Sequence, residues 1–397
     1  MSRGQVFPSE MSTYIDKKSG REVIKLTESG ANWHLYFTEN SFTMGKNEIY
    51  YMHREKGLDE GAEMQNMFRM NLDTGERTQI TEFEKDFKTV GSITKTPDSE
   101  ILVFIGDGDL YAMKMETGEY TLLCRAPVGY SLGAPSISFD KRYVAVAANE
   151  YVADRIPKVD GKKLHENYTG FKEQFYAHKN SRLIIACMDG SGADVVFEDT
   201  HWMGHIQFAP DTNEFISYCH EGPWNYVQQR IWLFNTVTRH VKPCYVQAEN
   251  DSIGHEFWTR DGQVFLDNRG RGHDGTITSD KTQAVTIDPD GEEDIPIVAF
   301  VDKDCKITRS LELPYYCNHY HANSANTLLV ADAVEDIMLI DIAGEKPSIE
   351  VLTEHNTTWR WQTVHCHPCW SWEDDKILYA SDGEKPGYPQ LYMVKMK

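Results

Sequence analysis

The clearest chemical signal in the chain is the run QTVHCHP, from Gln362 to Pro368, which brings two imidazoles and a carboxamide close together. In an extended backbone, residues i and i+2 point to the same face, so His365 and His367 converge on one point, and Pro368 ends the strand. Gln362 has an odd offset from His365, so a bulge or bend has to re-aim its side chain if all three share a ligand. This arrangement predicts a metal site.

A second dense patch, CNHYH from Cys317 to His321, offers His319 or His321 as a further donor from a neighbouring strand pair. Three imidazoles and one amide oxygen form a borderline ligand set that suits Mn, Fe, Ni or Zn, so residue types alone leave the metal open. The alternative is that these histidines are polar residues satisfied by hydrogen bonds. Cys366 and Cys369 form one CxxC pair without the second pair that a zinc knuckle needs, so we interpret them as structural.

Two more segments combine charged and aromatic side chains just before strand-like runs: HEGPWNYVQQRIW, which contains Arg230, and GHEFW, which contains His255. Such positions fall on loops at one end of a sheet, where binding and catalytic residues gather. Arg230 and His255 are therefore candidates for the site. The alternatives are an ion pair of Arg230 with Glu221 or Glu256, and a hydrogen-bonded His255 packed among aromatic rings.

Two other motifs lack the structural context that their chemistry needs. His201 and His205 have the i, i+4 spacing of helical ligands, but Gly204 and the strand pattern that follows favour a pair at a strand edge. The string GYSLG, which begins at Gly129, matches the GxSxG of serine hydrolases, whose nucleophile elbow joins a strand to a helix. A β-patterned run follows instead, which argues against a hydrolase.

A turn followed by a strand recurs seven times along the chain. Each unit is followed by a second strand that ends in a polar turn, with TQAVTIDPDGE at 282–292 the least regular, and helix-period patterns are few. A period of about 40 to 70 residues is typical of propeller blades, so the chain is predicted to be an all-β, seven-bladed β-propeller. The seven units are TMGKNEIYYM, TPDSEILVFIG, SFDKRYVAVAA, APDTNEFISYC, TRDGQVFLDN, NSANTLLVAD and SWEDDKILYAS.

The two ends of the chain are predicted to meet in the last blade. The final strand, PQLYMVK at 389–395, lacks the strand that should follow it, and EVIKLT at 22–27 can supply that strand, so that the ring has no free edge. The segment from Val152 to Gln174 breaks the period and is interpreted as a long loop rather than a linker. Residues 1–397 are therefore expected to form a single β-propeller domain.

The composition limits the classes of ligand that the protein can bind and indicates its cellular location. The 397 residues carry a formal charge of -21, which argues against nucleic acid as a partner, and an anionic substrate would need local positive charge from a metal or an arginine. The eight cysteines show no disulfide framework, and the chain has no signal core and no apolar run of about 18 residues. We expect a soluble, cytoplasmic protein that binds neither nucleic acid nor a membrane.

Several strings together resemble the oligogalacturonate lyases, a polysaccharide lyase family with a seven-bladed β-propeller fold. Weaker similarity extends from SGREVIKLT to the last strand, so it covers almost the whole chain, and the combination of HEFW with QxxHxHP is specific. The strings are WMGHIQFAPD, CHEGPWNYVQQRIWLF, HEFWTRDG, CNHYHANSANTLLVAD and HNTTWRWQTVHCHPCWSWEDDKILYASD.

The resemblance implies a set of site residues. A manganese ion would be bound by three imidazoles and one amide oxygen, with other divalent transition metals as alternatives. The implied ligands are His319, Gln362, His365 and His367. The catalytic base of the family falls on His255, and its catalytic arginine falls on Arg230.

The resemblance also implies a reaction. A base removes the proton next to the carboxylate of a uronate, the glycosidic oxygen on the neighbouring carbon departs, and a 4,5-unsaturated sugar remains. The expected partner is a small acidic oligosaccharide such as digalacturonate. Two alternatives stay open: a non-catalytic propeller that binds a ligand or partner, and a lyase or epimerase that acts on a different uronate. The sequence shows no phosphate loop or dinucleotide fingerprint, and it carries no signal for an oligomeric state.

Overall fold

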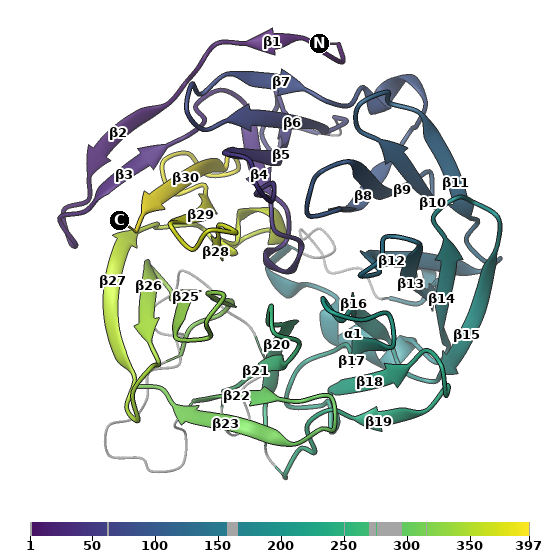
Figure 1. The fold of residues 1–397 in the computed structure, drawn as a ribbon. Coiled ribbons are helices and arrows are strands. Elements are labelled where there is room, and N and C mark those ends of the chain that lie inside the picture. The colour runs from purple at the N-terminus through teal and green to yellow at the C-terminus, as the bar shows by residue number, and fades with distance from the viewer. Residues whose placement is uncertain are drawn as a thin grey trace.

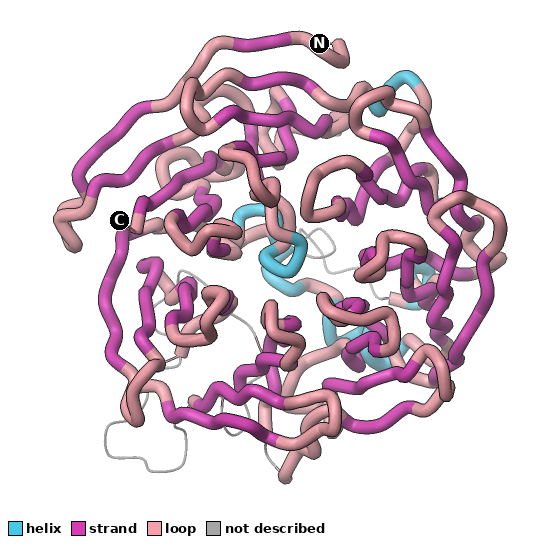
Figure 2. The backbone as a smooth tube through the Cα atoms, in the orientation of Figure 1, coloured by secondary structure: helices cyan, strands magenta, loops and turns pink. Residues whose placement is uncertain are grey.

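Seven small antiparallel sheets are arranged in a ring around a central axis (Figure 1). The computed structural model describes residues 2–61, 63–156, 166–249, 251–269, 275, 296–314 and 316–396. Strands make up most of the regular structure along this backbone, and helical turns are short (Figure 2). The predicted all-β, seven-bladed β-propeller is confirmed.

Each predicted turn–strand unit forms the second strand of its sheet, counted from the axis. These strands are apolar almost throughout because they lie between two neighbouring sheets and are covered on both faces. In β9 (Ile101–Gly106), for example, every residue after Ile101 is buried. The second strands are β5 (Glu48–Arg54), β9, β13 (Tyr143–Glu150), β17 (Phe215–His220), β21 (Val264–Asn268), β25 (Leu328–Asp332) and β29 (Lys376–Ser381).

The other strands complete each sheet on either side of the second strand. The innermost strands are β4 (Ala31–His34), β8 (Val90–Lys95), β12 (Tyr130–Ile137), β16 (Met203–Phe208), β20 (Ile253–Trp258), β24 (Tyr320–Ala322) and β28 (Cys369–Trp370). The third strands are β6 (Asn66–Asn71), β10 (Asp109–Lys114), β14 (Ser181–Cys187), β18 (Ile231–Asn235), β22 (Ile297–Val301), β26 (Asp336–Asp341) and β30 (Gln390–Lys395). The fourth strands are β7 (Arg77–Gln79), β11 (Tyr120–Cys124), β15 (Ala193–Asp199), β19 (Val241–Pro243), β23 (Ile307–Glu312), β27 (Ser348–Glu354) and β3 (Glu22–Lys25).

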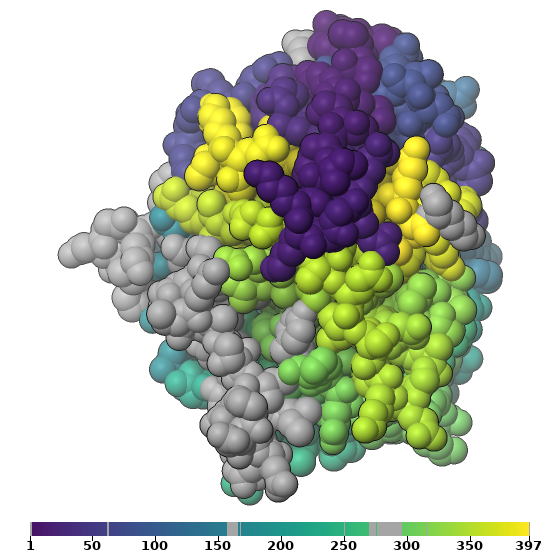
Figure 3. Space-filling view, turned by 90° about the vertical axis from the view of Figure 1, so that its left-hand side faces the viewer, coloured from purple at the N-terminus to yellow at the C-terminus, as the bar shows by residue number. Residues whose placement is uncertain are grey.

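Strands from both ends of the chain close the ring, as predicted. β3 pairs antiparallel with β30, with Val23 opposite Val394. Figure 3 shows the purple N-terminal residues lying against the yellow C-terminal residues on this side of the molecule. Two short strands extend the sheets outward: β2 (Ser12–Ile15) pairs with β3, and β1 (Val6–Phe7) pairs with β7. The N-terminal segment therefore contributes strands to both the first and the last sheet and joins them.

Apolar side chains between adjacent sheets hold the blades together. One cluster joins Phe265 and Val298 of one sheet to Leu329 and Met338 of the next, and all four side chains are buried. Tight interdigitation of this kind resists relative movement of the sheets. The innermost strands and the loops beside them are therefore held by a rigid frame, and they carry the site described below.

The helical turns fall in the connections between strands. The loop expected from Val152 to Gln174 contains η3 (Ala153–Arg155), η4 (Glu166–Tyr168) and the start of α1 (Phe171–Ala177), and its residues 157–165 lie outside the described residues. The remaining turns are η1 (Phe37–Glu39), η2 (Phe83–Lys85) and η5 (Gln362–Val364). In the described ranges no helix has the length and apolar character needed to cross a membrane.

Two sequence interpretations concern single strands. The strand expected at 282–292 lies outside the described residues, and the third strand of its sheet is β22, a few residues further along the chain. All of the GYSLG string after Gly129 lies within β12, which runs without a helix to Ile137, so the serine-hydrolase elbow is absent there. The β pattern after the motif was the correct signal.

The closing strand makes a stability prediction. Ile24 of β3 is 5% exposed and packs in a cluster with residues of β29 and β30, whereas Ile15 of β2 is 61% exposed. Because truncation of a buried side chain leaves a cavity, we expect Ile24→Ala to lower the free energy of unfolding by about 2–5 kcal/mol. Ile15→Ala is the matched control and should change it by less than about 0.5 kcal/mol. Urea unfolding measures both, and equal effects would contradict the closure described here.

Candidate active site

A cavity of about 460 Å³ lies where the innermost strands of several sheets converge. It is lined by residues that come from distant parts of the chain, among them Tyr36, His205, Gln207, Gln362, His365 and His367. Three of the residues predicted from sequence, Gln362, His365 and His367, therefore face one common space. Aromatic, polar and cationic side chains share its wall, as expected for a binding site rather than a packing defect.

Three imidazoles meet beside this cavity. His319 stands just before β24, and His365 and His367 stand just before β28 of the adjacent sheet. One nitrogen from each ring lies within 4.8 Å of the other two, and all three side chains are buried. The ring centres of His319 and His367 are 4.2 Å apart. The structure thus brings together three of the four predicted metal ligands in a group that we call the imidazole cluster.

The backbone around His365 and His367 differs from the extended strand that the sequence pattern predicted. Gln362 opens the 3-10 turn η5, His365 is extended, and His367 has a left-handed φ of 44°. Strand β28 begins only at Cys369. The prediction of a regular i, i+2 alternation was therefore wrong, although the predicted bend between Gln362 and His365 exists as η5. A left-handed residue other than glycine is strained, which is common where function constrains the chain.

A buried carboxylate holds this strained segment and the imidazole cluster together. Asp332 ends β25 and is fully buried. Its Oδ2 lies 2.9 Å from Nδ1 of His319, and its Oδ1 accepts a hydrogen bond of 2.6 Å from the His319 backbone N–H. Its Oδ2 also accepts a hydrogen bond of 3.3 Å from the backbone N–H of His367. A carboxylate that receives Nδ1–H leaves Nε2 of the His319 ring as the donor for a metal.

The imidazole cluster carries nitrogen atoms that lack protein partners. Within the described residues, Nδ1 of His365 and Nε2 of His367 are buried without a hydrogen bond. An unpaired buried polar atom costs about 1–3 kcal/mol, which a bound cation would offset. Burial also lowers the pKa of both rings well below the ordinary histidine value, so the neutral, metal-binding form prevails. Three imidazoles fit a borderline divalent transition metal.

Two other groups of donor side chains in the described part of the chain are already paired. Asp199 contacts Nδ1 of His201 at 3.0 Å and Nε2 of His220 at 2.9 Å, and the two rings are stacked with their planes 10° apart. Parallel rings do not direct two lone pairs at one point. The group of His205 and Glu221 is occupied by ion pairs described below. The imidazole cluster is therefore the group that best fits a metal.

The surroundings of the remaining sequence candidates show which of them are available as metal ligands. The side chain of Gln362 is exposed on the cavity, so its amide oxygen is available as a fourth donor. His321 is engaged elsewhere: its Nδ1 accepts a hydrogen bond of 3.1 Å from the backbone N–H of Trp370. Cys366 and Cys369 are both fully buried free thiols, in keeping with the structural role that we expected for them.

His255 lies directly beside the imidazole cluster on β20. Its ring centre is 4.3 Å from that of His319, and its Nδ1 is 2.9 Å from the carbonyl oxygen of Asn318. Because a carbonyl only accepts, Nδ1 carries the hydrogen and the Nε2 lone pair is free to take a proton. Burial, together with the nearby His319 and Arg269, lowers the pKa of His255 well below its ordinary value. The ring is therefore a neutral base.

Asn318 connects the environment of His255 to the imidazole cluster. Its side-chain Oδ1 accepts hydrogen bonds from Arg269 and from the hydroxyl of Tyr316, the latter at 2.7 Å. The guanidinium of Arg269 is held between the rings of Trp224 and Tyr316, at 3.7 and 3.5 Å from their centres. Because the Asn318 carbonyl binds His255 and the next residue belongs to the imidazole cluster, one anchored residue positions both.

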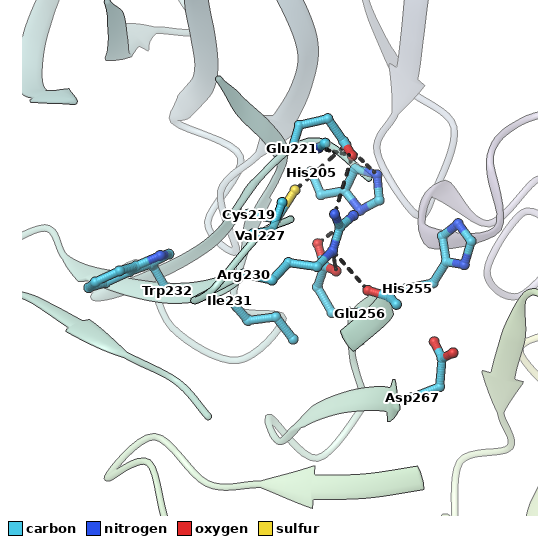
Figure 4. Close-up of polar contacts among 12 residues, drawn as sticks. His205, Cys219, Glu221, Val227, Arg230, Ile231, Trp232, His255, Glu256 and Asp267 are labelled. Carbon is cyan, nitrogen blue, oxygen red and sulfur yellow. Dashed lines mark hydrogen bonds and ion pairs between the residues drawn. The ribbon is translucent and has the colours of Figure 1, made fainter. Parts of the chain in front are cut away.

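Arg230 forms a buried ion-pair network with two carboxylates (Figure 4). The residue is 1% exposed, and its guanidinium lies 3.2 Å from Glu221 and 3.5 Å from Glu256. Its Nε also donates a hydrogen bond of 3.0 Å to the carbonyl of Gly254, the residue before His255. The ion pair that the sequence left open as an alternative is thus present. The same contact with Gly254 ties Arg230 to the backbone of His255.

His205 completes this network and faces the cavity. Its Nδ1 lies 2.8 Å from Glu256 and its Nε2 lies 3.4 Å from Glu221. Burial opposes a charge on the ring, but the two carboxylates outweigh it and raise the pKa of His205. The expected strand-edge pair is therefore divided: His205 belongs to the site, whereas His201 pairs with Asp199 at the protein surface.

Sequence reasoning missed three residues of the site: Asp332, Asn318 and Tyr36. Asp332 carried a readable signal, because a carboxylate ends an apolar strand immediately after the patch that contains His319. Asn318 lies inside that patch, but its role depends on a backbone carbonyl, which residue types do not reveal. Tyr36 follows β4, and only the path of the chain brings it to the cavity.

The fold and the site define a β-propeller with three buried histidines that could hold a metal ion, next to a fourth histidine in its neutral form. A family model described as oligogalacturonate lyase matches residues 1–397, and the chain therefore belongs to the oligogalacturonate lyase family. It is a carbon–oxygen lyase whose substrate is an oligosaccharide. The family and enzyme class predicted from the sequence are confirmed.

Individual relatives match over their full length. The chain is 25% identical over 424 residues to an oligogalacturonide lyase of Pectobacterium atrosepticum, covering all of this chain and 98% of the relative. It is also 25% identical over 422 residues to an oligogalacturonate lyase of Dickeya dadantii, with 98% of that protein covered.

Solved structures share the fold. An oligogalacturonate lyase in complex with manganese matches with a TM-score of 0.82 at 22% identity, covering all of this chain and 99% of the other. An oligogalacturonate lyase from Vibrio parahaemolyticus matches with a TM-score of 0.79 at 20% identity and the same coverage. At these identities the likeness supports the propeller architecture.

The contacts of Asp332 predict an effect on metal affinity. Asp332→Asn removes the charge that orients His319, so the affinity for Co²⁺, used as a spectroscopic probe of imidazole ligation, should fall by about 10- to 100-fold. Asp341→Asn, at the exposed end of β26, is the matched control and should leave the affinity unchanged. Titration of the visible absorption of bound Co²⁺ measures both. Unchanged affinity in Asp332→Asn would refute its assigned role.

The network around Arg230 predicts a large effect on stability. Arg230→Ala leaves Glu221 and the fully buried Glu256 with only His205 to balance both carboxylates among their described contacts, so the free energy of unfolding should fall by about 3–5 kcal/mol. Arg230→Ala combined with Glu256→Gln should recover part of this loss, because the buried charge is gone. Arg239→Ala, at an exposed turn, is the control for losing an arginine. Urea unfolding measures the free energy of unfolding of all three variants. If the double variant is no more stable than Arg230→Ala alone, the network described here is contradicted.

Proposed function

We propose that this chain is a manganese-dependent lyase that cleaves short galacturonate oligomers by β-elimination to 4,5-unsaturated products. The observation that carries the proposal is the placement of His255, whose ring centre is 4.3 Å from the imidazole cluster and whose hydrogen is fixed on Nδ1. β-Elimination next to a carboxylate needs a base and a cation at adjoining positions. Family membership supports the same reaction.

The metal would be held by three imidazoles and one amide oxygen. These ligands are His319, Gln362, His365 and His367. When bound, the ion withdraws negative charge from the substrate carboxylate and so makes the neighbouring C–H bond more acidic. Asp332 supports this assignment, because it fixes the His319 ring and the His367 backbone without occupying the cluster's free nitrogens. Manganese is supported by the related lyase structure that contains it.

His255 is proposed as the catalytic base. With Nδ1–H bound to the Asn318 carbonyl, Nε2 takes the C5 proton of the uronate, and the electron pair of the C–H bond forms the new double bond as the C4 oxygen departs. Positioned proton transfer of this kind accelerates a reaction by about 10²- to 10⁴-fold. Arg269 and Tyr316 bind the side chain of Asn318 and so hold this residue in place. The backbone carbonyl of Asn318 in turn keeps the His255 ring from turning.

Arg230 is proposed as the catalytic arginine because it lies in the HEGPWNYVQQRIW motif and contacts the residue before His255. Its charge balances Glu221 and Glu256, which would otherwise repel an anionic sugar from the cavity. Its hydrogen bond to the Gly254 carbonyl holds the strand that carries His255. The chain as a whole carries a charge of -21, so attraction for an acidic substrate has to be generated locally, by Arg230, Arg269 and the metal.

The state of the cysteine thiols is relevant to the cellular location of the protein. All eight cysteines are free, and five of them are buried. We propose a cytoplasmic location, where thiols remain reduced. Short oligomers would then reach the enzyme after transport into the cell.

The direct test is the reaction of purified protein with digalacturonate and Mn²⁺, followed by the ultraviolet absorbance of the unsaturated product. We expect His255→Ala to lower kcat by about 10²- to 10⁴-fold, because the proton acceptor is lost. His240→Ala, which removes an exposed histidine, should retain the activity of the unaltered protein. Removal of metal with a chelator should abolish the signal, and added Mn²⁺ should restore it.

The outcome distinguishes the alternatives. An epimerase would change the sugar without producing an ultraviolet chromophore, and a binding protein would leave the oligomer intact. Absence of unsaturated product from any uronate oligomer, with Mn²⁺ bound to the protein, would reject the proposed function.

A further inference from the structure

Tyr36 is the one phenol among the described residues that line the cavity. It follows β4 and precedes η1, where the chain leaves its sheet and turns into the middle of the ring (Figure 1). The side chain is only partly buried, and the exposed part faces the cavity rather than bulk solvent. No sequence motif pointed to this residue.

The ring of Tyr36 lies between the imidazole cluster and the network around Arg230. Its centre is 4.8 Å from that of His367, 6.1 Å from that of His319 and 5.9 Å from that of His205. His255 contacts the imidazole cluster from the side of His319, at 4.3 Å. The base and the phenol thus flank the imidazole cluster at different rings, with Tyr36 nearest His367.

The hydroxyl of Tyr36 is free for a ligand. Among the contacts of the described residues, no hydrogen bond from this hydroxyl to the protein is present, whereas two neighbouring tyrosines are engaged. Tyr316 donates to Asn318 at 2.7 Å, and the hydroxyl of Tyr320 accepts from the backbone N–H of Cys317 at 3.0 Å. A phenol at the wall of this cavity with no protein partner is placed to bind a polar atom of the substrate.

The stereochemistry of the substrate indicates which atom this is. In galacturonate, the C5 hydrogen and the C4 oxygen project from opposite faces of the sugar ring. When the substrate carboxylate is held at the imidazole cluster and the C5 hydrogen points toward His255, the C4 oxygen therefore points away from His255. Tyr36 lies away from His255 in this sense, because it contacts the imidazole cluster at His367.

We propose that Tyr36 is a further catalytic residue, whose hydroxyl donates a hydrogen bond to the glycosidic oxygen as it leaves C4. The inference rests on the proposed function. His255 takes the C5 proton, the C5–H electron pair becomes the C4=C5 bond, and the oxygen departs with the C4–O electron pair. The phenol stabilises the charge that develops on this oxygen, and water supplies the proton that completes the product hydroxyl. Tyr36 is unchanged at the end of the cycle.

The test compares two leaving groups in Tyr36→Phe. With digalacturonate, kcat should fall on the order of 10²-fold, with little change in KM, because a donor aimed at developing charge acts mainly in the transition state. With a 4-deoxy-4-fluoro galacturonide, whose fluoride leaves without such a donor, the loss should be several-fold smaller. Product absorbance and a fluoride electrode measure the two reactions. Tyr151→Phe, which alters an exposed tyrosine, is the control.

Mn²⁺ affinity, measured by electron paramagnetic resonance, keeps folding and metal binding apart from catalysis. The proposal requires that Tyr36→Phe binds Mn²⁺ as the unaltered protein does. Full activity of Tyr36→Phe on digalacturonate, an equal loss on both substrates, or a loss explained by weaker Mn²⁺ binding would each overturn it. If the unaltered protein releases neither unsaturated sugar nor fluoride, it is the proposed function that fails.

Discussion

The buried carboxylate of Asp332 is the contact on which the site depends. It ends β25, a strand buried between two neighbouring sheets, and it binds one side chain and two backbone N–H groups from two separate loops. A fully buried charge is tolerated only when several donors satisfy it, so these loops are held in place by the energetic demand of the carboxylate itself. Two donors of the imidazole cluster, His319 and His367, are thereby positioned before any metal binds.

The propeller supplies the frame that this contact requires. The innermost strands and the loops beside them face the centre of the ring, so residues far apart in sequence, such as Tyr36, His205 and His365, reach one cavity. Closure of the ring by β3 and β30 fixes the relation between the first and last sheets. A site assembled from several rigid sheets holds its geometry better than one built on a single flexible loop.

The charges beside the cavity balance one another locally, although the chain as a whole is strongly acidic. Arg230 and His205 face Glu221 and Glu256 in a network whose opposite charges largely cancel. Arg269, held between two aromatic rings, adds a cation that acts through Asn318 on the backbone next to the imidazole cluster. The excess negative charge of the chain remains outside this network, where water screens it.

The sequence by itself determined the seven-bladed ring, its closure by both termini and the histidines that form the imidazole cluster, because repeated turn–strand units and the HxH spacing are local patterns. It did not determine the backbone at His367, where a left-handed residue replaced the expected strand. Only the tertiary structure decided that His205 and Tyr36 join the site and that Asp332 and Asn318 orient it. These roles arise from contacts between sheets, and no periodicity within one segment records which loops the closed ring brings together.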